Sequence, residues 1–145
     1  MATILVVDDN AVVARVLARL LQQRGHRALV AADGPAALDT VRQQGPDLVL
    51  LDMMMPDMDG LEVLRRLKAD PKTAGPPVIL FSAVDDPKVV AKAMGEGAKD
   101  YWVKASFKFE DLPQRLARHL PAAPGAGEQK GPEKSDDPGD AGGKN

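Results

Sequence analysis

The 145-residue sequence has no cysteine, which excludes a disulfide scaffold, a zinc–thiolate site and a thiol nucleophile. It has no excess of basic residues either, because 19 Lys and Arg stand against 21 Asp and Glu. We therefore expect no direct contact with nucleic acid, which would need a basic patch or stripe. No apolar run approaches the roughly 18 residues of a membrane span. These absences predict a globular, cytoplasmic protein that does not insert into a membrane.

Large apolar residues are missing from one segment of the chain, residues 121–145. This segment contains six Gly and four Pro, and no Val, Ile, Leu, Met, Phe, Trp or Tyr. Side chains of this kind cannot offset the entropy lost on ordering, so we expect a disordered tail that folding does not require. Residues 1–120 are then expected to form a single domain.

The remaining residues alternate between two kinds of segment. Short apolar runs at 4–7, 48–51 and 78–81 are typical of strands buried on both faces, and weaker runs at 28–32 and 101–103 suit edge strands. Between them, apolar residues recur at helical spacing, with Val16 counted in the apolar stripe of the first helix. The last helix is expected near 109–120. The pattern predicts a doubly wound α/β domain with a five-stranded parallel sheet and five helices.

Polar residues follow four of the five predicted strands. Asp8 and Asp9 end the first, Asp52 the third, Ser82 the fourth and Lys104 the fifth. Because the carboxyl ends of parallel strands share one edge of the sheet, we expect these side chains to converge. Two like charges 4 Å apart repel by about 4 kcal/mol at an effective dielectric of 20, and an all-oxygen cluster favours Mg²⁺ as the counterion.

With a cation and an ammonium in place, such an edge can hold a phosphoryl group, and a carboxylate is the available nucleophile. The motifs at this edge are LVVDD, LDMMMPDMDG, FSA and DYWVK. With these motifs, residues 3–120 resemble the receiver domain of two-component response regulators. The separations also match, with 30 residues from Asp52 to Ser82 and 22 from Ser82 to Lys104.

The resemblance implies a flavodoxin-like or CheY-like sheet of order 2-1-3-4-5 and a role for each acid. Asp52 is expected to be the phosphoacceptor. Asp8, Asp9, Asp52 and the backbone carbonyl of Met54 are expected to hold Mg²⁺.

The same resemblance assigns the phosphoryl contacts and the switch. Lys104 is expected to pair with a phosphoryl oxygen, Ser82 to donate its hydroxyl and move toward it, and Tyr101 to turn inward when Ser82 moves. One residue departs from the family pattern, because Ala105 stands where receivers usually have proline.

The expected function is that of a single-domain response regulator. It would accept a phosphoryl group from a histidine kinase or histidine phosphotransfer protein and signal to an unknown protein target. It would catalyse only its own phosphotransfer and slow autodephosphorylation. Two alternatives remain open: a pseudo-receiver that only binds partners, and a Mg²⁺-dependent phosphohydrolase with an aspartate nucleophile. His26 and His119 are expected to be solvated.

Overall fold

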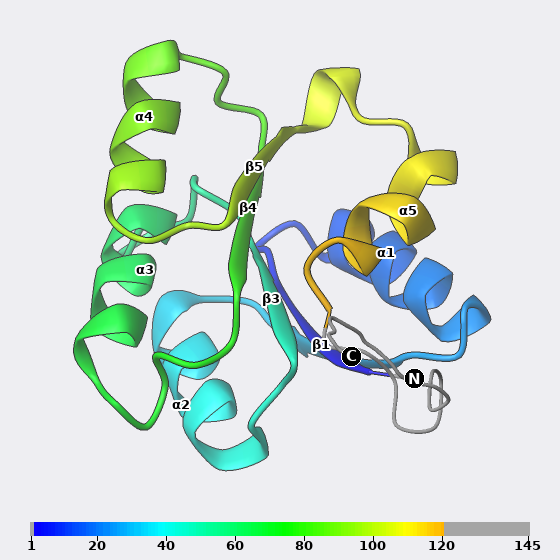
Figure 1. Cartoon of the computed structure of the whole chain (residues 1–145), viewed down its shortest axis with the longest axis horizontal. Helices are drawn as coiled ribbons and strands as arrows, with labels where there is room; N and C mark the ends of the chain where they lie inside the picture. Colours follow the sequence, from blue (N-terminus) through cyan, green and yellow to red (C-terminus); the bar gives the residue numbers. More distant parts are fainter. Residues whose placement is uncertain (1, 121–145) are drawn as a thin grey trace, which may run out of the picture.

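The computed structural model describes residues 2–120, so the tail expected at 121–145 lies outside the described residues. These residues alternate strand and helix five times, as the sequence predicts (Figure 1). The elements are β1 (Thr3–Val7), α1 (Ala11–Gln23), β2 (Arg27–Ala31), α2 (Gly34–Gln44), β3 (Leu48–Leu51), α3 (Gly60–Ala69), β4 (Val78–Ser82), α4 (Pro87–Gly95), β5 (Asp100–Val103), the 3₁₀ turns η1 (Lys104–Ser106) and η2 (Phe109–Asp111), and α5 (Leu112–Ala117).

The five strands form one parallel sheet of order β2-β1-β3-β4-β5, which confirms the predicted topology. Helices α2, α3 and α4 cover one face of the sheet, and α1 and α5 cover the other (Figure 1). Alternate side chains of each strand feed two separate cores. In β4, for example, Leu80 packs on the side of α2, α3 and α4, whereas Ile79 and Phe81 pack with α1 and α5. Among the described residues, no helix has both the length and the apolar character needed to cross a bilayer.

Short polar side chains begin four of the helices. Asn10, Asp33, Asp59 and Asp86 each accept a hydrogen bond from a backbone N–H in the first turn of α1, α2, α3 and α4 respectively. Such caps satisfy donors that have no partner inside the helix, and each contributes about 1 kcal/mol. Three of the capped helices begin within a few residues of a strand end, so the caps also fix the loops at that edge of the sheet.

Three local predictions differ from the structure. Val16 is 43% exposed, because it lies two residues beyond the buried Ala14 and therefore about 200° around the helix. The expected helix at 109–120 is shorter: η2 comes first, and Pro113 lies in the first turn of α5. His119 is not solvated, because its side chain is 16% exposed and lies 3.1 Å from Asp100.

The Asp100 carboxylate joins β5 to the end of α5. Its Oδ2 atom accepts a hydrogen bond from Trp102 Nε1 at 3.0 Å and lies 3.1 Å from His119 Nε2. Burial opposes ionisation of Asp100, but its hydrogen bonds from Tyr101, Trp102 and His119 outweigh burial and lower its pKa. The last helix is thus fastened to the sheet at the end opposite the predicted acid cluster.

Gly60 marks the closest approach of a helix to the loop after β3. A Cβ atom added there would lie 2.3 Å from the carbonyl oxygen of Asp52 and 2.8 Å from Cα of Met53. The Gly60 N–H also donates to the Met53 carbonyl at 2.9 Å. The absence of a side chain at Gly60 therefore lets α3 begin against the backbone of Asp52.

We predict that Gly60→Ala destabilises the protein by about 1–3 kcal/mol, because the backbone of Asp52 and Met53 must move to admit the methyl group. Urea unfolding would measure the change in free energy. Gly95→Ala is the matched control, since an added Cβ at Gly95 has no neighbour within 4 Å. Equal effects of the two substitutions would contradict this account of Gly60.

Candidate functional site

The carboxyl edge of the sheet brings the predicted acids together. Asp8 and Asp9 follow β1, and Asp52 follows β3, which pairs with β1. One carboxylate oxygen from each of the three lies within 4.8 Å of the others. Asp8 and Asp52 are buried and Asp9 is exposed, so the cluster opens to solvent on the side of Asp9. Three oxygen donors at this spacing suit a hard divalent cation.

Lys104 supplies the positive charge at this cluster. Its Nζ atom lies 2.8 Å from Asp8 Oδ2 and 3.6 Å from Asp52 Oδ2, although the two acids are 44 residues apart in the chain. The Lys104 side chain is 23% exposed, and those of Asp8 and Asp52 are 2% and 7% exposed. A charge pair so little hydrated is screened weakly by salt. Lys104 therefore partly compensates two buried carboxylates at once.

Burial raises the pKa of Asp52, and the neighbouring Asp8 carboxylate raises this pKa further. The Lys104 ammonium and a hydrogen bond from the Met54 N–H act in the opposite direction without cancelling the rise. The Met54 N–H donates to Asp52 Oδ1 at 3.3 Å, whereas the Met54 side chain is 63% exposed. The folded protein thus holds the ionised form of Asp52 at a cost, which an added cation would relieve.

Ser82 and Tyr101 lie on the neighbouring strands. Ser82 ends β4, is fully buried, and pairs in register with Val103, so Lys104 follows directly beside it. Its hydroxyl oxygen accepts a hydrogen bond from the Val84 N–H at 3.1 Å. The Tyr101 hydroxyl donates to the Val84 carbonyl at 2.7 Å. Burial raises the pKa of the Tyr101 hydroxyl. The backbone of Val84 therefore links the Ser82 hydroxyl to the Tyr101 hydroxyl.

Three further residues shape the site without having been predicted from the sequence. The Asn10 N–H donates to Asp8 Oδ1 at 2.8 Å and so orients that carboxylate. Gly60 admits α3 beside Asp52. Lys104 Nζ lies 5.6 Å from the ring centroid of Phe81. The sequence signal for the close approach of α3 to Asp52 is Gly60 itself, which directly follows the helix-capping Asp59. The Lys104–Phe81 contact has no local sequence signal, because it depends on the packing between strands.

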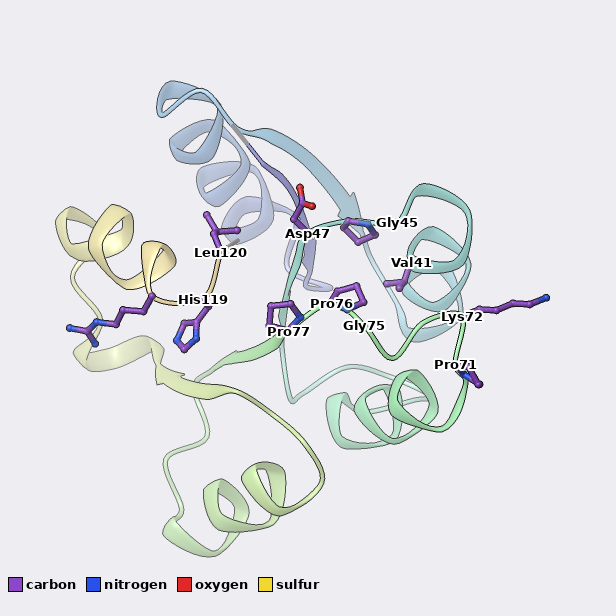
Figure 2. A pocket seen from close by; sticks show the side chains of 12 residues that line it. Val41, Gly45, Asp47, Pro71, Lys72, Gly75, Pro76, Pro77, His119 and Leu120 are labelled. Carbon is purple, nitrogen blue, oxygen red and sulfur yellow. The ribbon is translucent and has the colours of Figure 1, made fainter. Parts of the chain in front are cut away.

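A second hollow lies at the opposite edge of the sheet (Figure 2), where Pro76 and Pro77 stand between Val41 and His119. Two of its polar side chains, Asp47 and His119, are bonded within the protein. Asp47 accepts a hydrogen bond from the Thr3 N–H at 2.8 Å, and His119 bonds to Asp100. The acid cluster is therefore the stronger candidate site.

The protein thus belongs to the class of doubly wound α/β domains, whose ligands bind at the carboxyl edge of the sheet, and here that edge carries three acids and a lysine. Within that class, the chain matches the response regulator receiver domain family over residues 4–117, and it belongs to that family.

Two curated relatives give the scale of the similarity. The DNA-binding response regulator MtrA of Mycobacterium tuberculosis is 42% identical over 117 residues, which cover 81% of this chain and 50% of MtrA. The response regulator PleD of Caulobacter vibrioides is 42% identical over 103 residues, which cover 71% of this chain and 23% of PleD. The chain thus spans half or less of these two relatives.

Solved structures agree with this fold. The chemotaxis protein CheY4 of Vibrio cholerae has a TM-score of 0.77 at 28% identity, covering 83% of this chain and 99% of that structure. The receiver domain of the Pseudomonas aeruginosa sensor histidine kinase PA1611 has a TM-score of 0.74 at 30% identity, covering 81% and 96%. The latter structure is described as having a magnesium ion coordinated in its active site cleft.

We predict that Asp52→Asn stabilises the metal-free protein at neutral pH by about 1 kcal/mol, because it removes a buried carboxylate that Asp8 also repels. The pKa of Asp52 is raised on folding, so its ionised form costs stability above that pKa. The gain should therefore shrink as the pH falls and Asp52 becomes protonated. Urea unfolding in a chelator at several pH values measures it, with the exposed Asp85→Asn as control.

Adding Mg²⁺ should reverse the order of the two proteins. A cation that binds only the folded state stabilises it by about 1.4 kcal/mol at ten times its dissociation constant. The wild type should gain more than Asp52→Asn in the same titration. An equal gain for both would place the cation away from Asp52.

Proposed function

We propose that this receiver accepts a phosphoryl group on Asp52, from a histidine kinase or a histidine phosphotransfer protein, and signals through contacts with a partner protein. The observation that carries the proposal is the placement of Lys104 between Asp8 and Asp52 beside a solvent-open carboxylate, Asp9. This arrangement offers a nucleophile, a cation site and an ammonium at one point. It acts only on its own aspartate, with no separate substrate to turn over.

In the proposed reaction, an Asp52 carboxylate oxygen attacks the phosphorus of the donor. The bond between phosphorus and the donor's leaving nitrogen or oxygen breaks, and an acyl phosphate forms. Asp8, Asp9, Asp52 and the Met54 carbonyl are the ligands we propose for Mg²⁺. When bound, the ion would neutralise charge on the transferring oxygens.

In this proposal the Lys104 ammonium binds the phosphoryl group on Asp52. In the unphosphorylated protein its ammonium contacts the Asp8 carboxylate at 2.8 Å. A phosphoryl group on Asp52 would offer this ammonium a dianion in place of the more distant Asp52 oxygen. Ordered donors of this kind stabilise charge without needing to reorganise during the reaction.

Ser82 and Tyr101 are the switch in this proposal. The Ser82 hydroxyl can donate to the phosphoryl while its oxygen loses the contact with the Val84 N–H. Since Tyr101 bonds to the carbonyl of the same Val84, a shift of this loop would alter the ring and the surface around β5. The energy for the change comes from contacts that Ser82 makes only with the phosphorylated site.

Intact-mass measurement after treatment with acetyl phosphate and Mg²⁺ tests the proposal. We predict one added phosphoryl group on the wild type, none without Mg²⁺ and none on Asp52→Asn. Asp57→Asn is the matched control, because Asp57 is an exposed acid in the same loop and should be labelled at the wild-type rate. Absence of an adduct from the wild type would instead favour the pseudo-receiver.

We also predict that the acyl phosphate of the wild type decays slowly, over minutes or longer rather than seconds. The residues two positions after Asp52 and Ser82 are Met54 and Val84, neither of which has a side chain that can hydrogen-bond an attacking water. Met54→Gln together with Val84→Gln should accelerate hydrolysis, as followed by loss of the mass adduct. Decay of the wild type within seconds would contradict this assignment.

A further inference from the structure

Aromatic side chains are scarce in this protein and are concentrated beside Lys104. The whole sequence has three Phe, one Trp and one Tyr. All three phenylalanines and the tryptophan form one cluster on the α5 face of the sheet. Phe81 meets Phe107 edge to face at 5.2 Å between centroids and Phe109 at 6.3 Å, and Phe107 stacks on Trp102 at 5.2 Å.

The backbone that follows Lys104 is held only loosely by its own hydrogen bonds. The Phe107 N–H lies 3.4 Å from the Lys104 carbonyl, and the Ser106 hydroxyl lies 3.4 Å from the Val103 carbonyl. Both distances are at the long end of the hydrogen-bond range. Ala105 and Ser106 are exposed, so neither side chain anchors the turn. The first buried anchor after Lys104 is the Phe107 ring, which is 9% exposed.

Phe81 forms one wall of the space occupied by the Lys104 ammonium. Nζ lies 5.6 Å from the Phe81 centroid, while the same atom contacts Asp8 and Asp52. A cation is attracted to the face of an aromatic ring within about 6 Å. Phe81 in turn meets both Phe107 and Phe109 edge to face, and these two rings meet one another at 5.5 Å.

We infer that Phe109, acting with Phe107, is a positioning residue for Lys104. Its ring holds Phe81 in the orientation that places the Lys104 ammonium between Asp8 and Asp52. This inference rests on the proposed phosphorylation of Asp52 and adds to it a group that does not touch the reacting atoms. Phe109 is the informative position to change, because it is 42% exposed and its removal leaves the buried core filled.

The test is the rate of phosphorylation by acetyl phosphate at saturating Mg²⁺, measured by intact mass. Phe109→Ala and Phe109→Leu are expected to lower the rate about threefold to tenfold, the loss that corresponds to one aromatic pair. Phe109→Tyr keeps the ring and should restore the wild-type rate. Met94→Ala is the matched control, because Met94 is 43% exposed and lies on α4, and it should leave the rate unchanged.

A double-mutant cycle separates positioning from general damage. In a Lys104→Ala background, Phe109→Ala should cause no further loss of rate, because the group that it positions is gone. Leucine retains apolar volume, so Phe109→Leu carries the test should the alanine variant unfold.

Three results would overturn the inference while leaving the proposed function intact: a wild-type rate for Phe109→Ala, equal rates for Phe109→Leu and Phe109→Tyr, or an undiminished effect of Phe109→Ala without Lys104. A wild type that takes up no phosphoryl group would overturn both.

Discussion

The repulsion between buried carboxylates at one edge of the sheet is the constraint on which the rest of the site depends. Asp8 and Asp52 are nearly inaccessible to water, yet their strands pair side by side and leave the two acids no room to separate. Lys104, 96 residues away from Asp8 in the chain, provides a single positive charge against the two. One ammonium between two carboxylates leaves a net negative site. Burial raises the pKa of Asp52, the Asp8 carboxylate raises it further, and the Lys104 ammonium does not cancel the rise.

The fold meets this constraint by placing backbone where a side chain would be too large. Gly60 lets α3 start against Asp52, and the N–H groups of Met54 and Asn10 each bond to a carboxylate oxygen of the cluster. These contacts fix the acids in orientation while leaving Asp9 open to solvent. A buried charge cluster without such donors would cost stability and gain no defined geometry. The same loops therefore hold the buried Asp8 and Asp52 carboxylates in place and leave the Asp9 carboxylate accessible to solvent.

Much of this arrangement could be predicted from the sequence, because parallel strands place the residues after them at a common edge. That rule alone locates Asp8, Asp9, Asp52, Ser82 and Lys104. The structure brings one carboxylate oxygen of each acid within 4.8 Å of the others, and Lys104 contacts Asp8 and Asp52. The sequence did not predict contacts that depend on the packing of distant elements. Nothing local to Val16 indicates which way α1 is rotated over the sheet, and nothing local to His119 indicates that Asp100 lies opposite it. The Phe81 ring beside Lys104 belongs to the same category.

The alternation of side chains along β4 has a consequence for how such a protein can change over evolution. Phe81 and Ser82 are adjacent, yet one faces α5 with the aromatic cluster and the other is linked through Val84 to Tyr101. Insertion of a single residue in β4 would exchange the two faces, so the length of this strand is fixed. Ala105 and Ser106, directly after Lys104, are exposed and lie beyond the end of the sheet, so they are free of that restriction. Changes in the length of this segment and in the aromatic residues near it can alter the packing on the α5 face of the sheet. The contacts of Ser82, Val84 and Tyr101 need not change with them.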